Sequence, residues 1–244
     1  MRSNVLISLI FVSLCAACSG REQAAPSLDA GTDSGPDYDP SVLTVPFAVD
    51  DHYIPSGCIG DCAASVTIDS NCPSRGVVDA QGECHHFVYS VNTAPDALGW
   101  AGLLWQTDEK NWGSEQRWQV APGATHVHFW AKGVVTSSTP GVATAPQITF
   151  VMGGINGDDT GKACDAGLSC ASDACTNGAC TAPYHDTLDL VKQETLGADA
   201  YSLFEIPFEN HSYGSLVLSG FGWTVTMPAG ASTIEFYVDD LRWE

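Results

Sequence analysis

Tryptophan is concentrated in one short stretch of the chain, residues 100–130. This stretch holds five of the seven tryptophans, at positions 100, 105, 112, 118 and 130. Polar side chains lie between the rings, at Gln106, Asn111, Arg117, His126 and His128. Indole rings stack on the C–H faces of a ligand such as a sugar, while amide, imidazole and guanidinium groups hydrogen-bond to its hydroxyls. The stretch predicts a sugar-binding surface or, since tryptophan is mostly buried, a part of the core.

Alternating apolar and polar residues divide residues 126–132 between two faces of a strand. Successive side chains of a strand point to opposite sides of the sheet. The predicted core face carries Val127, Phe129 and Ala131. The opposite face carries His126, His128, Trp130 and Lys132. We therefore expect two imidazoles, an indole and an ammonium group on the outer face of a sheet.

The end of the chain shows the same alternation. Over 233–241 the predicted core residues are Ile234, Phe236 and Val238. The residues expected on the outer face are Glu235, Tyr237 and Asp239.

Catalytic patterns are sparse. Glycoside hydrolysis needs two carboxylates beside the scissile bond, and Glu205 and Glu235 are the least implausible pair. The sequence contains no G-x-S-x-G nucleophile motif. His85 and His86 are adjacent, so on a strand they would point to opposite faces and could not share a metal. We expect no catalytic residues, and a glycoside-active enzyme is the minority alternative.

Ten cysteines bear on the compartment and on the covalent framework. Setting aside Cys15 and Cys18 leaves eight in two even clusters: Cys58, Cys62, Cys72 and Cys84, then Cys164, Cys170, Cys175 and Cys180. Even numbers in an exported chain predict disulfides, here within each cluster, with three connectivities open to each. Zinc ligation is the competing interpretation, but no spacing gives C-x-x-C.

The amino-terminal 17 residues have the layout of a secretory signal. They carry one basic residue, Arg2, no acid, and a short apolar run that ends in two alanines. The segment LCAAC resembles the lipobox of bacterial lipoproteins, which implies lipidation of Cys18. We therefore expect residues 1–17 to be a lipoprotein signal peptide, and the chain to be exported and lipid-anchored to a bacterial envelope; plain secretion is the alternative. The outer membrane or cell surface is the expected location.

Charge and composition describe the mature chain. Removing residues 1–17 leaves 8 basic and 29 acidic residues, a formal charge of 8 − 29 = −21. This charge disfavours nucleic acid and anionic lipid as partners and is compatible with cations and neutral sugars. Residues 18–44 are rich in small and acidic residues and poor in large apolar ones. They are predicted to be a flexible acidic linker because they cannot bury enough surface to fold.

The remaining residues, 45–244, fit one domain. No window has a sustained helical period, and short alternating runs are separated by Gly, Pro, Asn and Asp. The expected strands are 84–91, 99–106, 126–132, 147–152, 203–207, 221–226 and 233–241. The predicted fold is all-β: an antiparallel β-sandwich with a disulfide-rich inserted loop at about 158–183, where almost nothing apolar is available to bury.

Several segments together resemble a family. GWAGLLWQ, NWG, PGATHVHFWAKG, ITFVMGG, GFGW and IEFYVDDLRWE are similar in order and spacing to the galactose-binding-like jelly rolls of bacterial carbohydrate-binding modules. The resemblance covers most of 45–244 apart from the second cysteine cluster. It implies a jelly roll and, as an expectation, a carbohydrate partner.

The resemblance also implies a structural calcium ion between the first and last strands. The matching acids are Asp50, Asp51, Asp239 and Asp240. Two acid pairs brought together by strand pairing would supply the oxygen ligands that calcium requires. Asp61, Asp158 and Asp159 could serve equally, and all of these residues could be ordinary loop or strand-end aspartates.

The second implied site is a sugar groove. Its candidate stacking rings are Trp105, Trp112, Trp130 and Trp223. Its candidate hydrogen-bonding partners are Gln106, Asn111, Arg117 and His128. Trp100 and Trp118 flank strands and are expected to pack in the core or at a sheet edge. Trp112 lies in a polar loop and is the ring expected to be most exposed.

These expectations combine into one functional hypothesis. The chain is interpreted as a non-catalytic carbohydrate-binding lipoprotein, with possible structural calcium as its only cofactor. The alternative is a structural or adhesive surface lipoprotein that binds protein partners. Exposed, clustered indoles favour sugar, and scattered, buried indoles favour the structural alternative.

Overall fold

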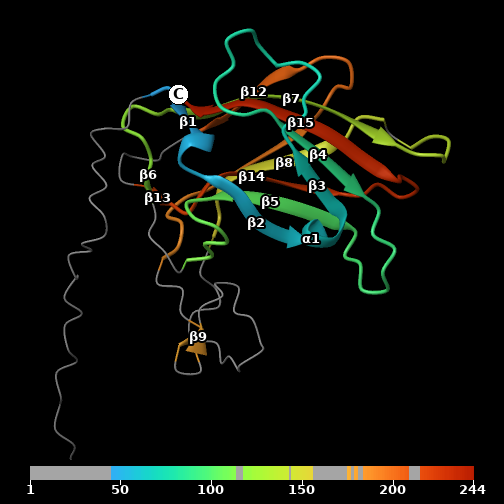
Figure 1. Cartoon of the computed structure of the whole chain (residues 1–244), viewed down its shortest axis with the longest axis horizontal. Coiled ribbons are helices and arrows are strands. Elements are labelled where there is room, and N and C mark those ends of the chain that lie inside the picture. The colour runs from blue at the N-terminus through green and yellow to red at the C-terminus, as the bar shows by residue number, and fades with distance from the viewer. Residues whose placement is uncertain are drawn as a thin grey trace, which may run out of the picture. The chain divides into compact units, whose positions relative to one another are not determined.

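The computed structural model describes residues 45–113, 118–142, 144–155, 184–208 and 215–244, together with the backbone of 175–176 and 179–180. The predicted signal peptide, the lipidation site Cys18 and the linker 18–44 lie outside the described residues. Two sheets make up most of what is described (Figure 1). Within these residues, no helix is long and apolar enough to cross a membrane.

The first sheet has six strands. Its order is β12 (Ser202–Pro207), β7 (His126–Thr136), β15 (Thr233–Trp243), β4 (His85–Ser90) and β3 (Val66–Asp69), with β1 (Phe47–Ala48) also paired to β15. Each pair is antiparallel. The two longest strands, β7 and β15, are neighbours in its middle, and the last strand of the chain is therefore central to the fold.

The second sheet has five strands. Its order is β11 (Asp189–Thr195), β8 (Gln147–Gly153), β14 (Ser219–Thr226), β5 (Trp100–Gln106) and β2 (Ile54–Gly60), again antiparallel throughout. Two small ladders join β6 (Trp118–Gln119) to β13 (Leu216–Val217), and β9 (Cys175–Thr176) to β10 (Ala179–Cys180). The helices are short: a 3-10 turn η2 (Val49–Asp51) and α1 (Cys62–Ser65).

The main core lies between the two sheets and is rich in aromatic rings. Alternate residues of β7 and β15 point inward, and Val127, Phe129, Phe236 and Val238 are completely buried, as predicted. The largest rings interlock edge to face, for example Phe87 with the indoles contributed by the second sheet. The predicted antiparallel β-sandwich of jelly-roll type is confirmed.

A bulge near the end of β15 decides which way its last residues point. The register shifts between Asp239 and Arg242, and Asp240 has a positive φ of 55°. The extra residue resets the alternation, so that Leu241 and Trp243 return to the core while Arg242 and Glu244 are half-buried. The carboxyl-terminal residues therefore do not follow the simple alternation read from 233–241.

The four cysteines of the first cluster form two disulfide bonds. Cys58 bonds to Cys62, and Cys72 bonds to Cys84, so the expected pairing within the cluster is confirmed. The second bond closes the loop 70–84 that joins β3 to β4. The second cluster falls in the predicted insertion, where the structure describes only the backbone of β9 and β10. Cys164 and Cys170 lie outside the described residues.

Candidate functional site

The outer face of the six-stranded sheet carries the polar and aromatic row that the alternation predicted. His126, Trp130 and Lys132 are half-buried along β7, and His128 lies among them. Strand β12 places Glu205 opposite His128, and β15 places Tyr237 opposite Lys132. Two groups of side chains lie on this face, one mainly aromatic and one built on histidines.

The first group, named here the aromatic platform, consists of His86, Trp130, Lys132, Tyr201 and Tyr237, all half-buried. The Lys132 ammonium lies 4.5 Å from the ring centre of Tyr201 and 5.0 Å from that of Tyr237. The His86 ring stacks on Tyr237 at 4.5 Å with an interplanar angle of 8°. Aromatic faces and a cation thus lie side by side on adjacent strands.

The tyrosines of the platform keep their hydroxyl protons at neutral pH. Burial, followed by the charge of Asp239, raises the pKa of Tyr201 to about 12. Burial, followed by a hydrogen bond to Glu235, raises the pKa of Tyr237. The Tyr237 hydroxyl donates to Glu235 over 2.6 Å, and the same Oε1 atom lies 3.1 Å from His86 Nε2. The platform therefore combines ring faces with oriented polar groups.

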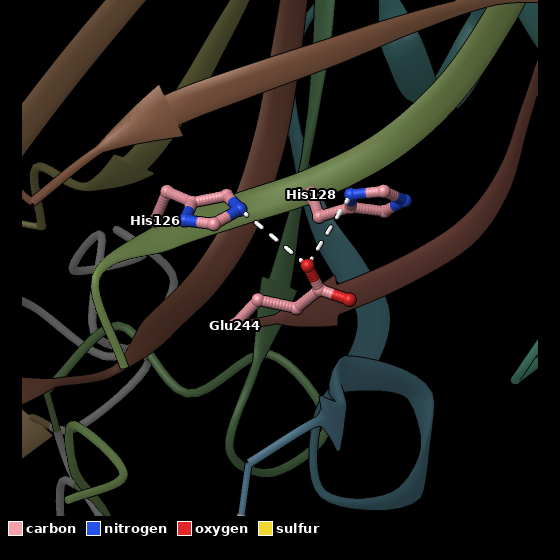
Figure 2. A group of neighbouring side chains, drawn as sticks. All are labelled: His126, His128 and Glu244. Atoms are coloured by element: carbon pink, nitrogen blue, oxygen red, sulfur yellow. Dashed lines mark ion pairs between the residues drawn. The ribbon is translucent and has the colours of Figure 1, made fainter. Parts of the chain in front are cut away.

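The second group, the histidine cluster, consists of His126, His128 and Glu244 (Figure 2). Glu244 Oε2 lies 3.6 Å from Nε2 of His126 and 3.7 Å from Nδ1 of His128. Both distances are longer than a hydrogen bond. The two rings point toward one carboxylate from the same face of β7, as Figure 2 shows.

Charged neighbours surround the histidine cluster. Asp240 Oδ2 lies 3.4 Å from His128 Nε2, and Arg242 donates to both oxygens of Asp240 at 2.7 and 2.8 Å. Burial lowers the pKa of His128, and the charge of Arg242 lowers it further, against the carboxylates of Glu244 and Asp240. The imidazole of His128 is therefore neutral at neutral pH.

The four aspartates expected to bind calcium do not converge. Asp239 is completely buried, and its oxygens accept hydrogen bonds from Arg75 Nε at 2.8 and 3.0 Å. Asp240 is held by Arg242, and the exposed Asp51 joins no metal-binding group in the described part of the chain. Protein donors already satisfy the buried carboxylates, so the donor set does not fit calcium.

Two further calcium candidates, Asp50 and Asp61, also accept hydrogen bonds from protein donors. Asp50 accepts from His85 Nε2 at 2.8 Å, from Trp105 Nε1 at 3.0 Å and from the backbone of Glu83 at 3.0 Å. Asp61 accepts from the backbone of Leu98 and Gly99 and from Tyr89 and Asn92. Asp158 and Asp159 lie outside the described residues.

Two of the predicted stacking rings belong to the core, which corrects the prediction. Trp105 and Trp223 are completely buried, because they fall on the inward alternation of β5 and β14. Trp105 packs on His85 at 5.0 Å and Trp223 on Phe236 at 4.9 Å. A ring without exposed surface cannot stack on a ligand.

Two predicted hydrogen-bonding partners are also internal. The buried side chain of Gln106 accepts from Ser56 Oγ and donates to the backbone oxygen of Asn111, both at 3.0 Å. Asn111 itself is buried and donates to Thr107 Oγ1 at 2.7 Å. These amides fix the loop that follows β5, so the prediction that they contact a ligand is wrong in this structure.

The other ring candidates keep some exposed surface. Trp112 is half-buried, packed against the small cluster of Leu104, Ile155 and Leu218 outside the main core. Trp118 packs on the edge of the main core, as predicted, and Trp100 is half-buried. Arg117 lies outside the described residues. Of the predicted stacking rings, Trp112 and Trp130 keep exposed surface, Trp112 in the loop after β5 and Trp130 on β7 of the other sheet.

The carboxylate pair considered for glycoside hydrolysis is far apart. Glu205 is opposite His128 in β7, whereas Glu235 is opposite Val134, six residues further along the same strand. At about 3.3 Å per residue, this separation is roughly 20 Å. Paired catalytic carboxylates lie at most about 10 Å apart, so these two cannot act together on one glycosidic bond.

Two residues of these groups escaped the sequence analysis. Tyr201 precedes β12, and no pattern placed its ring over Lys132. Glu244 was missed because alternation counted from 233–241 does not allow for the bulge at Asp240. The charged ending that includes Arg242 and Glu244 was the available signal.

The chain is similar to known proteins in its structure but not in its sequence. No known protein family matches the sequence, and no curated protein matches it. Similar solved structures include a family 11 carbohydrate-binding module from Clostridium thermocellum in complex with a β-1,3-1,4-mixed-linked tetrasaccharide. It is 13% identical, covers 78% of this chain and 95% of its own, and has a TM-score of 0.34.

Two further structures are similar. A chain from a study of promiscuous carbohydrate-binding modules of the β-sandwich superfamily is 10% identical, covers 81% of this chain and 60% of its own, and has a TM-score of 0.38. A family 28 module specific for non-crystalline cellulose is 14% identical, covers 83% of this chain and 94% of its own, and has a TM-score of 0.35. The strand pairing described above defines this chain as an antiparallel jelly-roll sandwich.

Proposed function

We propose that this protein binds carbohydrate without modifying it, and that the sugar rests on the aromatic platform. The supporting observation is that Trp130, Tyr201 and Tyr237 are half-buried on the same sheet face, where the two tyrosine rings lie against the Lys132 ammonium and Trp130 is two residues from Lys132 on β7. Half-exposed rings offer faces for stacking on sugar C–H groups. The platform contains one of the predicted stacking rings, Trp130, and adds the two tyrosines.

The polar groups around the rings suit a neutral glycan. Lys132 donates and Glu235 accepts, and the hydroxyls of Tyr237 and Tyr201, whose protons go to Glu235 and to the backbone oxygen of Ser74, can accept. Leu203, 43% exposed and directly opposite Trp130 on β12, extends the apolar surface at the edge of the platform. The formal net charge of −20 would repel an acidic polysaccharide. The proposed ligand is therefore an uncharged oligo- or polysaccharide.

The cellular setting is part of this proposal and comes from the sequence. The signal-like segment and the lipobox-like LCAAC support export and lipid attachment at Cys18 of a bacterial envelope protein. The acidic linker 18–44 would then separate the sandwich from the lipid. Globomycin treatment of a producing bacterium would test the anchor, because a lipoprotein precursor accumulates when its signal peptidase is inhibited.

A glycan array tests the binding function. The full chain is expected to bind neutral plant or bacterial polysaccharides, and Trp130→Ala is expected to weaken binding by up to about tenfold, since stacking on one aromatic ring contributes about 0.5–1.5 kcal/mol. Trp112→Ala is the matched control because it removes another half-buried indole, which lies away from the platform in the loop after β5. A blank array would overturn the proposal. Loss of binding with the control alone would move the site away from the platform.

A further inference from the structure

We propose that His126, His128 and Glu244 bind one divalent transition-metal ion, with zinc the best match. The proposal is independent of carbohydrate binding. Two imidazole nitrogens and one carboxylate oxygen converge, and all three candidate ligand atoms lie within 4.8 Å of one another. No other such group of His, Cys, Asp or Glu occurs in the part of the chain that the structure describes.

The spacing of these atoms suits tetrahedral coordination. Bonds of about 2.0–2.1 Å to zinc place neighbouring ligand atoms about 3.3 Å apart. The measured distances from Glu244 Oε2 are 3.6 Å to His126 and 3.7 Å to His128, so shifts of a few tenths of an ångström would close the site. Without an ion, these contacts are too long for hydrogen bonds.

The backbone already holds the ligands in place. The backbone N–H of His126 donates to the oxygen of Glu244, and that of Glu244 donates to the oxygen of His126, both at 2.9 Å. His126 and His128 are two residues apart on β7 and therefore share a face. The site thus lies at one end of two paired central strands, with Glu244 directly after β15, and backbone hydrogen bonds fix the positions of its ligands.

Neighbouring groups leave the required lone pairs free. Thr125 Oγ1 lies 2.8 Å from His126 Nδ1 and donates to Glu244 O at 3.0 Å, so the hydroxyl oxygen accepts from Nδ1–H. Nε2 of His126 then carries its lone pair, and this buried atom has no hydrogen-bond partner among the described residues. A buried nitrogen that lacks a hydrogen bond is costly, and a metal would satisfy it.

The other two ligands are oriented in the same way. Nε2 of His128 also has no hydrogen bond among the described residues, but the negatively charged Asp240 Oδ2 lies 3.4 Å away and favours the proton on that nitrogen, which leaves the lone pair on Nδ1. Arg242 Nε donates to Oε1 of Glu244 at 2.7 Å and leaves Oε2 for the ion. Such outer partners fix tautomers and ligand orientation in metal sites.

Local charge and ligand type select the ion. Glu205, Asp240 and Glu244 contribute three negative charges and Arg242 one positive charge, a local balance of −3 + 1 = −2 that matches a divalent cation. Glu205 Oε1 lies 3.6 Å from His126 Nε2 but is not part of the converging group, so its half-exposed side chain would have to rotate to become the fourth ligand in place of water. Two nitrogens favour zinc and its transition-metal neighbours over calcium, which prefers oxygen alone.

Calorimetric titration of the full chain with zinc chloride in a non-chelating buffer tests the site. We expect saturable 1:1 binding and at least about 100-fold weaker affinity in His128→Gln, because even outer partners of a metal contribute 10–100-fold. His86→Gln is the matched control: His86 also lies between two carboxylates, but Asp69 and Glu235 contact opposite ring nitrogens at 3.1 Å. The control should bind zinc as the wild type does.

Two outcomes would overturn the proposal: no saturable zinc binding, or wild-type affinity in His128→Gln. Glu244→Gln changes only a half-buried terminal side chain and provides the same test if the histidine variant fails to fold. Cobalt substitution adds an independent measurement, because tetrahedral Co²⁺ absorbs strongly in the visible range. That absorption should appear in the wild type and in His86→Gln, and be lost in Glu244→Gln.

Discussion

Replacing Arg75 by alanine would reveal what neutralises the buried aspartate at the end of the last strand. Asp239 is completely buried. Nη2 of Arg75 lies 2.7 Å from its Oδ1, and Nε of Arg75 donates to both of its carboxylate oxygens. The hydrogen bond to Asp239 raises the pKa of Arg75, so the guanidinium is always charged. Arg75 thus neutralises Asp239, one of the four aspartates for which the resemblance implied calcium.

The size of the effect follows from burial. Removing one partner of a fully buried ion pair costs about 3–5 kcal/mol. The Arg75 side chain is 42% exposed, and Asp239 keeps hydrogen bonds from the backbone N–H groups of Gly76 and Asp240. We therefore discount the loss to about 2 kcal/mol. At about 2–4 °C per kcal/mol for a chain of this size, Arg75→Ala should melt about 4–8 °C lower.

Differential scanning calorimetry of the full chain provides the measurement. Arg75→Lys should fall between wild type and Arg75→Ala, because lysine keeps the charge but loses the paired contacts. Neither calcium nor a chelator should shift the wild-type melting temperature. A rise with calcium, or an unchanged melting temperature in Arg75→Ala, would refute the assignment of Arg75 as the neutralising group.

Three further predictions concern the framework of the sandwich. The double substitution Cys72→Ser with Cys84→Ser opens a loop of sequence separation 12 and should lower the free energy of unfolding by about 3 kcal/mol in urea titrations. Trp112→Ala should cost about 2 kcal/mol by the same assay, roughly half the value for a fully buried ring, and a negligible change would mean that its packing is not formed. Hydrogen bonds, first that from the backbone of Leu98, lower the pKa of Asp61. The ionised Asp61 carboxylate therefore stabilises the fold fully above its unfolded pKa of about 3.9, and this stabilisation is lost as the pH falls through its lower folded pKa. Asp61→Asn should lower the melting temperature at pH 7 but much less in strong acid.

Alternation predicted the central strands well. The expected strands 126–132 and 233–241 correspond to β7 and β15, each of which continues beyond the predicted end. The strands that the sequence analysis missed include β2 and β11, at the edges of the second sheet. β2 contains Pro55 and two glycines. In β11, Lys192 and Glu194 are among the side chains that point toward the opposite sheet. Neither strand therefore has a clear apolar face. Edge strands need fewer buried side chains, and their patterns are weaker.

The identity of individual rings was harder to predict. Trp105 and Trp130 both stand in alternating strands beside polar residues, yet one is completely buried and the other half-buried. The difference depends on which face of each strand meets the opposite sheet, and an apolar residue on both faces of β5 hides that choice. The outer row of β7 was predicted correctly because its polar residues occur strictly at alternate positions.

The sequence by itself determined the β-sandwich class, that the four cysteines of the first cluster pair among themselves though not with which partner, and the face on which His126, His128 and Trp130 lie. These features depend on local periodicity and on short chain distances. Tertiary structure alone decided that Arg75 neutralises Asp239, that Tyr201 covers Lys132, and that Glu244 meets the two histidines. Each of these contacts joins segments far apart in the chain: Arg75 reaches Asp239 from the loop between β3 and β4, Tyr201 is brought to Lys132 by the pairing of β12 with β7, and Glu244 is brought to the histidines by the bulge in β15. Local residue pattern sets neither strand register nor the path of such a loop.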